Sequence, residues 1–179
     1  MSKIGKINIP IPEKVKVLLS GNTVNVEGPL GKQEIKLDLE MFELNITEGK
    51  DVSIKPKKLD DISKRLWGMN RSLLNNAIIG ASSGYEKILE LTGVGFRAAL
   101  KGNILNMQVG FSHDINFNIP EGIKIVVEKQ TTLKIIGSNK QQVGMIASQI
   151  KSIRPPEPYK GKGIKEKGQY ILRKEGKKK

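Results

Sequence analysis

Short stretches that alternate apolar and polar residues fill the first third of the chain. Residues 34–39 place Ile35, Leu37 and Leu39 on one face, which is the period of a half-buried strand. Similar stretches are Val15–Leu19, Thr23–Val26, Phe42–Ile46 and Val52–Ile54. Turn-forming residues separate them. The pattern predicts an antiparallel sheet with one solvent-facing side.

After this sheet the apolar residues recur at helical spacing. Asp60 or Asp61 fits the N-cap, and the helix should end near Gly80. We expect the core-facing residues to be Ile62, Leu66, Met69, Leu73 and Ala77. This face leaves Trp67 off the core side, either filling a gap between two units or partly exposed. The helix is predicted to cover the apolar face of the sheet.

The same order of strands, turns and helix then returns. The turn Lys101-Gly102-Asn103 mirrors Ser20-Gly21-Asn22, and Gly110-Phe111-Ser112 stands where Pro29-Leu30-Gly31 stood. The expected strands are Leu89–Leu91, Ala98–Leu100, Ile104–Val109, Asp114–Ile119, Ile123–Val127 and Leu133–Ile136. A helix should follow from Ser138 or Asn139, with apolar Val143, Ile146, Ala147, Ile150 and Ile153.

A matched order of this kind indicates an internal duplication. The predicted fold class is α+β, with two tandem duplicated domains, each an antiparallel sheet packed against one amphipathic helix, plus a basic C-terminal extension. We expect the domains at residues 1–82 and 83–153, with a tail at 154–179. Pro155 and Pro156 end the second helix, and nothing after them has core periodicity. The tail is therefore expected to lie outside both folded units, and its loss should leave them folded.

The charge distribution makes this tail the main functional candidate. The chain carries 31 Lys and Arg against 18 Asp and Glu, a net charge of +13. Residues 1–82 contribute a net +3, residues 83–150 a net +2, and residues 151–179 a net +8. Such a surplus favours a polyanion, nucleic acid before an anionic membrane. Lysines neutralise phosphates, glycines allow close backbone approach, and Tyr159 and Tyr170 can stack on bases. The alternative is a disordered tail that only aids solubility.

The remaining candidates for chemistry are weak. There is no cysteine, which excludes disulfides and thiolate chemistry. Gly93-Val94-Gly95 lacks the third glycine of a phosphate loop and reads better as a bend between strands, although Arg97 beside it can still reach a phosphate. His113 precedes Asp114, but no nucleophile or second ligand accompanies them, so we expect a surface histidine. We predict no catalytic site, metal, cofactor, membrane association or small-molecule substrate.

Several motifs resemble those of one known family. The run Arg154-Pro155-Pro156-Glu157-Pro158-Tyr159-Lys160-Gly161-Lys162-Gly163-Ile164-Lys165 is similar to the C-terminal signature of the large-subunit ribosomal protein six family, bacterial type. Ser2–Lys6, Gly93–Ala98 and Arg173–Lys177 resemble that family too. The departure is Glu166–Leu172, where the family has a different continuation.

This resemblance implies a structural component of the large ribosomal subunit that binds large-subunit rRNA near the sarcin–ricin loop and the stalk base. Its implied partners are that rRNA, neighbouring large-subunit proteins and nearby translational GTPases, and its implied location is a cytoplasmic ribosome or, for an organelle-encoded copy, a mitochondrial or plastid one. The residues expected at the rRNA are Arg97, Arg154, Tyr159, Lys160, Lys162, Lys165, Arg173, Lys174, Lys177 and Lys178. Two alternatives remain open: a free RNA- or DNA-binding regulator, and an RNA-modifying enzyme that uses His113 and Asp114.

Overall fold

The computed structural model describes residues 3–47, 50–58 and 60–176, and the chain divides into two compact units. Unit 1 comprises Met1–Tyr85 with Ser138–Lys140, and unit 2 comprises Glu86–Gly137 with Gln141–Lys179. Each unit combines small antiparallel sheets with one long helix. This arrangement confirms the predicted α+β class and the duplication.

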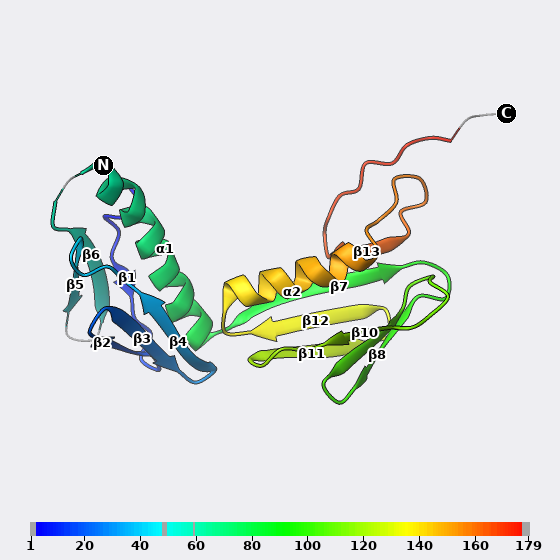
Figure 1. Ribbon diagram of the computed structural model, residues 1–179, viewed down its shortest axis with the longest axis horizontal. Helices are drawn as coiled ribbons and strands as arrows, with labels where there is room; N and C mark the ends of the chain where they lie inside the picture. The colour runs from blue at the N-terminus through cyan, green and yellow to red at the C-terminus, as the bar shows by residue number, and fades with distance from the viewer. Residues whose placement is uncertain (1–2, 48–49, 59, 177–179) are drawn as a thin grey trace. The chain divides into compact units, whose positions relative to one another are not determined.

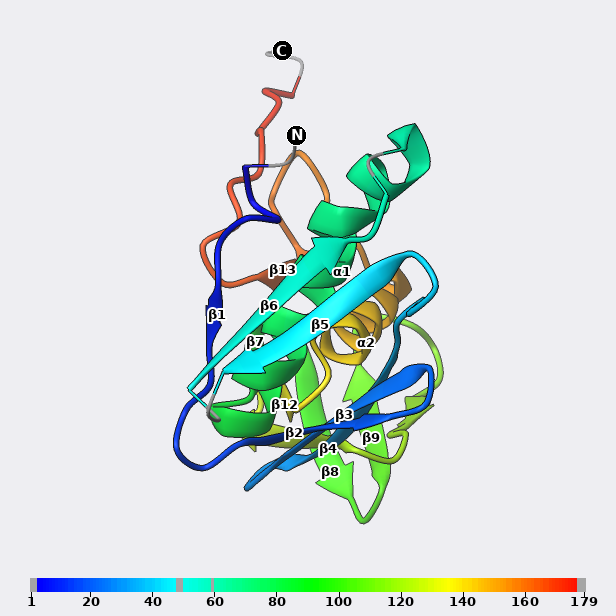
Figure 2. The same ribbon diagram turned by 90° about the vertical axis from the view of Figure 1, so that its left-hand side faces the viewer.

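Unit 1 contains two three-stranded sheets and a helix of 22 residues. Its elements are β1 (Ile9–Pro10), β2 (Lys16–Ser20), β3 (Thr23–Gly28), β4 (Gly31–Lys36), β5 (Phe42–Thr47), β6 (Asp51–Pro56) and α1 (Asp61–Ser82). One sheet has the order β2-β3-β4 and the other β1-β6-β5. In the second sheet β5 and β6 form a hairpin, and β1 lies along the outer side of β6 (Figure 2).

Unit 2 repeats this plan and adds a strand. Its elements are β7 (Tyr85–Thr92), β8 (Arg97–Lys101), β9 (Ile104–Gln108), β10 (Ile115–Asn118), β11 (Ile123–Glu128), β12 (Thr132–Gly137), α2 (Lys140–Ile153) and β13 (Gly163–Glu166). The sheets have the orders β10-β9-β8 and β11-β12-β7-β13. The order β11-β12-β7 therefore matches β5-β6-β1, and β13 is the addition, seen beside β7 in Figure 1.

The expectation that the tail lies outside both folded units is wrong. β13 pairs antiparallel with β7, with Ile164 opposite Leu91, and the Ile164 side chain is 0% exposed. Four residues are too few to show an apolar period, and only one of them, Ile164, is a large apolar residue. The free edge of β7 provides the hydrogen bonds that make this short segment a strand.

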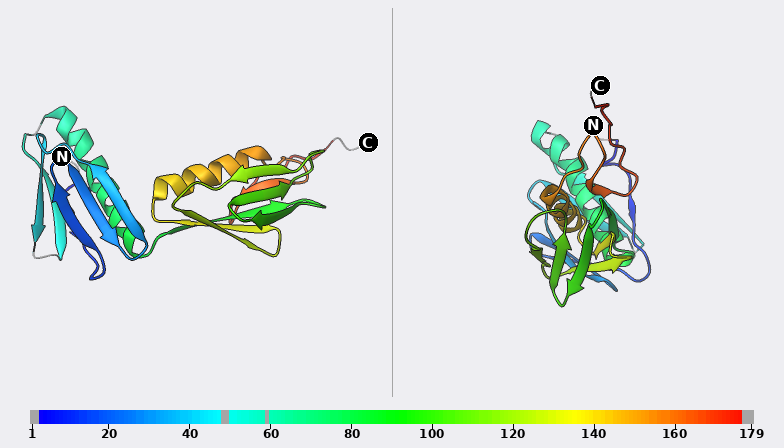
Figure 3. Two further views of the ribbon diagram at one scale, coloured as in Figure 1. Left: turned by 60° about the horizontal axis from the view of Figure 1, so that its bottom comes forward. Right: turned by 90° about the vertical axis from the view of Figure 1, so that its right-hand side faces the viewer.

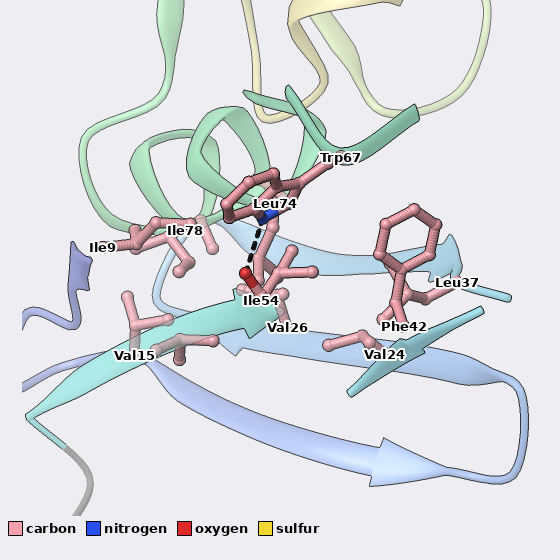
Figure 4. Packing of buried hydrophobic residues seen from close by; sticks show 13 residues of the cluster. Ile9, Val15, Val24, Val26, Leu37, Phe42, Ile54, Trp67, Leu74 and Ile78 are labelled. Atoms are coloured by element: carbon pink, nitrogen blue, oxygen red, sulfur yellow. Dashed lines mark hydrogen bonds between the residues drawn. The ribbon is translucent and has the colours of Figure 1, made fainter. Parts of the chain in front are cut away.

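The predicted core face of α1 is confirmed only in part: Ala77 is buried, and Leu66 packs half-buried against the core. Ile62, Met69 and Leu73 are 55%, 49% and 41% exposed, whereas Trp67, Leu74 and other residues one position further along face the sheets. Trp67 is 6% exposed, and its indole Nε1 donates a hydrogen bond of 2.6 Å to the carbonyl of Ile54 on β6 (Figure 4). The buried residues of α1 are Ser63, Trp67, Asn70, Leu74, Ala77, Ile78, Gly80 and Ala81.

This rotation has a physical cause. The observed face buries the large indole of Trp67 while its N–H donates a hydrogen bond. It also buries the Ser63 hydroxyl, which donates to the carbonyls of Lys58 and Asp60. The sequence suggested that Trp67 fills a gap between two units or is partly exposed. In the structure it belongs to the core of unit 1.

The predicted core face of α2 is confirmed in its first three turns. Val143, Ile146, Ala147 and Ile150 are buried, and Ile153 at the last position is half-buried. α2 lies along one face of the unit 2 strands (Figure 3). Its C-terminal end leads directly into the segment that carries most of the excess charge. Within the described residues, no helix combines the length and apolar character needed to cross a membrane.

Candidate nucleic-acid interface

The chain reverses direction just after α2. Gly161 and Gly163 have φ values of +71° and +144°, in the region that disfavours L side chains. A Cβ at Gly163 would lie 2.5 Å from the Cα of Pro156, so only glycine fits there. The tail therefore does not leave the fold after the prolines that end α2, although the sequence predicted a tail outside both folded units. The glycines fold it back along β7.

This reversal forms a closed turn over residues 157–162. The amide of Glu157 donates to the carbonyl of Lys162 at 2.9 Å, and the amide of Gly161 donates to the carbonyl of Glu157 at 3.1 Å. The amide of Ile164 then donates to the carbonyl of Arg154 at 2.8 Å. Tyr159, at 58% exposure, and the exposed Lys160 and Lys162 stand on this turn. The backbone thus holds two cations and one aromatic ring in solvent.

The last described residues return to the same turn. The amide of Lys174 donates to the carbonyl of Pro158 at 2.9 Å. The Arg173 guanidinium lies beside Gly161, where an added Cβ would be 3.5 Å from Nη2. A groove of about 370 Å³ is lined by Lys165, Gln169, Tyr170, Ile171 and Arg173. Cations from both ends of the tail therefore meet around one turn.

Among the residues that the structure describes, these cations have no carboxylate partner. Within residues 3–47, 50–58 and 60–176, no carboxylate forms an ion pair with the exposed side chains of Lys160, Lys162, Arg173 and Lys174. Exposed like charges repel one another, and an external anion relieves this repulsion. The arrangement suits a ligand with several negative charges at spaced positions, such as a phosphate backbone.

Ion pairs also connect β13 to its neighbours in unit 2. Lys165 pairs with Glu90 on β7 at 3.2 Å. The Glu166 carboxylate accepts hydrogen bonds from Lys87 at 2.7 Å and Lys151 at 3.0 Å, and these two ammonium groups lower the pKa of Glu166 below its ordinary value. Glu166 thus joins β7, α2 and β13. The sequence did not suggest this role, because Glu166 lies in the segment 166–172 that differs from the family's usual continuation.

The sequence-predicted site residues fall into four groups. Tyr159, Lys160, Lys162, Arg173 and Lys174 come together at the turn, as described above. Lys165 is close in the chain, but its charge is shared with Glu90. Arg97 and Arg154 lie on other parts of unit 2, at the start of β8 and just after α2. Lys177 and Lys178 lie outside the described residues.

Arg97 and Arg154 each contact residues that sequence reasoning did not assign to binding. The Arg97 guanidinium donates to the Gln108 side chain, and the Arg154 guanidinium lies over the Phe111 ring at 5.3 Å from its centroid. Phe111 also stacks on His113, with ring centroids 6.2 Å apart. The sequence signal that could have indicated this contact was Phe111, an aromatic residue in a turn where unit 1 has Leu30.

The His113–Asp114 pair does not form an acid–base dyad. His113 is exposed, as predicted. The Asp114 carboxylate accepts hydrogen bonds from the amides of Gln108 at 2.8 Å and Asn106 at 3.4 Å, both on β9. Asp114 thereby anchors the turn to the sheet. Within the described residues, no group of three or more potential metal ligands occurs.

Comparison with known proteins identifies the family. The family model for Ribosomal protein L6 matches residues 92–167. Large ribosomal subunit protein uL6 of Beijerinckia indica is 46% identical over 179 residues, covering 100% of both chains. The uL6 proteins of Xanthobacter autotrophicus, at 47% over 179 residues, and Caulobacter vibrioides, at 46% over 181 residues, are likewise covered completely.

These full-length similarities confirm the resemblance of the C-terminal motif. The relatives are ribosomal proteins rather than enzymes, which confirms the expectation that the chain has no catalytic role. The chain belongs to the uL6 family of large ribosomal subunit proteins.

Proposed function

We propose that this protein is a structural constituent of the large ribosomal subunit and that residues 154–179 bind large-subunit rRNA. The rRNA segment is that near the sarcin–ricin loop and the stalk base, and the bound protein supports the region where translational GTPases dock. Neighbouring large-subunit proteins complete its surroundings. The relatives compared above come from bacteria, which favours a cytoplasmic ribosome over an organellar one.

The observation that carries this proposal is the closed turn over residues 157–162. Its backbone hydrogen bonds hold Lys160 and Lys162 in solvent, and Arg173 and Lys174 return to it from the end of the tail. Ordered cations lose less conformational entropy on binding than cations on a free tail. Contacts to phosphates should therefore dominate over base-specific contacts, and binding should weaken steeply with salt.

The experiment compares two charge-matched double variants. Lys160→Gln with Lys162→Gln removes two cations from the turn. Lys16→Gln with Lys36→Gln removes two exposed cations from β2 and β4 of unit 1. Affinity for large-subunit rRNA is measured as a function of salt, together with co-sedimentation with large subunits at moderate salt.

The turn variant should lower the slope of log affinity against log salt by about 0.7–0.9 for each lost phosphate contact, and it should reduce co-sedimentation. The unit 1 variant should leave both close to wild type. Equal slopes for the two variants would contradict the assignment of the turn. A free pool of protein that turns over an RNA substrate would instead support an RNA-modifying enzyme.

A further inference from the structure

A second feature of unit 2 differs in chemistry from the lysine-rich turn. Phe111, His113 and Arg154 bring three flat groups together on the surface. We propose that these three residues form a stacking site for an unpaired base of RNA. The inference rests on the proposed rRNA binding and adds to it a contact with the face of a base, whereas the turn over residues 157–162 contacts phosphates.

The geometry is that of a platform. The Phe111 and His113 rings have centroids 6.2 Å apart and an interplanar angle of 29°. The Arg154 guanidinium lies 5.3 Å from the Phe111 centroid. Phe111 is 43% exposed, and His113 and Arg154 are exposed as well. Aromatic rings, histidine and the guanidinium plane are the groups on which proteins stack splayed-out RNA bases.

The platform is held in place by the sheet beneath it. Gly110, at φ +81°, turns the chain after β9, and an added Cβ there would lie 3.2 Å from the Phe96 ring. On the other side of His113, Asp114 accepts hydrogen bonds from Gln108 and Asn106. The Asp114 end of the turn is thus tied to β9, so binding a base costs little ordering of the protein there.

The surrounding charge favours RNA over a protein partner. Arg97 donates to Gln108, which in turn donates to Asp114, so a second guanidinium is linked to the turn. Arg154 leads within three residues into the closed turn with Lys160 and Lys162. The carboxylate next to His113 is that of Asp114, and both of its oxygens already accept hydrogen bonds. The site therefore offers π faces and positive charge.

The test measures binding of large-subunit rRNA to full-length variants at several salt concentrations. Phe111→Leu keeps an apolar side chain but removes the ring. Leu30→Ala, at the corresponding turn of unit 1, changes a 53% exposed residue and is the matched control. Phe111→Leu should weaken affinity about tenfold, with the salt slope unchanged, because stacking releases no counterions. Leu30→Ala should bind as wild type does.

A second measurement does not depend on the stability of the variant. Ultraviolet crosslinking of wild-type protein to the same rRNA, read by mass spectrometry, should attach a nucleotide to Phe111 or His113. Absence of that adduct, or wild-type affinity of Phe111→Leu, would overturn the proposed stacking site. The change in salt slope of the Lys160 and Lys162 variant would still support rRNA binding by the turn. Normal rRNA affinity with poorer co-sedimentation would assign the site to a protein and also overturn the inference. If neither the wild-type protein nor any variant binds large-subunit rRNA, both proposals are overturned.

Discussion

The two units of this molecule share one plan but treat the edge of the sheet differently. In unit 1 the sheet β5-β6-β1 ends at β1, which has two residues, Ile9 and Pro10. In unit 2 the corresponding strand β7 has eight residues, and β13 covers its free side. Long unpaired edges invite association with other strands. Unit 1 limits this hazard with a short strand and a proline that has no N–H, whereas unit 2 uses the tail.

This difference shows how a duplicated fold acquired an asymmetric surface. The added strand makes the described part of the basic tail, up to residue 176, belong to unit 2, so the cations of the turn over residues 157–162 stand at fixed places. Unit 1 has a net charge of +3 over residues 1–82, while residues 151–179 carry +8. The proposed rRNA contacts are accordingly confined to the unit that has the extra strand.

The largest expected effect comes from removing the side chain that anchors this strand. Ile164→Ala should destabilise unit 2 by about 2–5 kcal/mol, because it truncates a fully buried side chain on β13, beside β7, and leaves a cavity there. Chemical denaturation followed by circular dichroism reports both units. Fluorescence of Trp67, the single tryptophan, reports unit 1. The circular dichroism transition should shift more than the fluorescence transition.

Leu172→Ala is the matched control for this variant, because Leu172 lies in the same tail and is 69% exposed. It should change stability by less than about 0.5 kcal/mol. A loss below about 1 kcal/mol for Ile164→Ala would mean that β13 adds little to unit 2. The comparison of the two sheet edges would then lose its energetic basis.

An intermediate effect is expected in the core of unit 1. Trp67→Phe removes the donor to the Ile54 carbonyl and should cost about 1–3 kcal/mol, since that buried acceptor loses its partner. Met69→Ala, two residues away but 49% exposed, should cost less than about 1 kcal/mol. Hydrogen exchange of α1 amides measures both. A larger loss for Met69→Ala would restore the helix face predicted from the sequence.

The smallest effect concerns the carboxylate that holds the added strand. Lys87 and Lys151 lower the pKa of Glu166, so its ionised form stabilises the fold at pH values above the pKa of this carboxyl in the unfolded chain. This contribution is lost as pH falls through the lower folded-state pKa. Because these side chains are 30–42% exposed, Glu166→Gln should cost only about 0.5–1 kcal/mol at pH 7.

Unfolding free energies of Glu166→Gln and wild type should therefore differ at pH 7 and converge only once the pH has fallen below the lowered folded-state pKa of Glu166. The matched control is Glu175→Gln, which changes an exposed carboxylate of the same tail that has no ion pair among the described residues; it should change stability at pH 7 by less than about 0.5 kcal/mol. A pH-independent difference for Glu166→Gln would indicate a packing effect in place of the ion pairs.

Much of the fold could be predicted because alternation and turn residues are local properties. Each strand expected from the sequence overlaps a strand of the structure, and the buried residues of α2 are those its spacing predicted. The face of α1 could not be predicted in the same way. Its sequence offers apolar residues on two sides, and the choice depends on which side finds partners for Trp67 and Ser63.

The candidate site divides along the same line. The basic tail, its glycines and its family signature were visible in the sequence, because charge and covalent backbone freedom belong to the residues themselves. The sequence alone also established the duplication and the α+β class. Only the tertiary structure decided that Ile164 is buried, that Glu166 binds two lysines, and that Arg154 lies over Phe111. These contacts join residues far apart in the chain, and long-range pairing leaves no local periodicity to read.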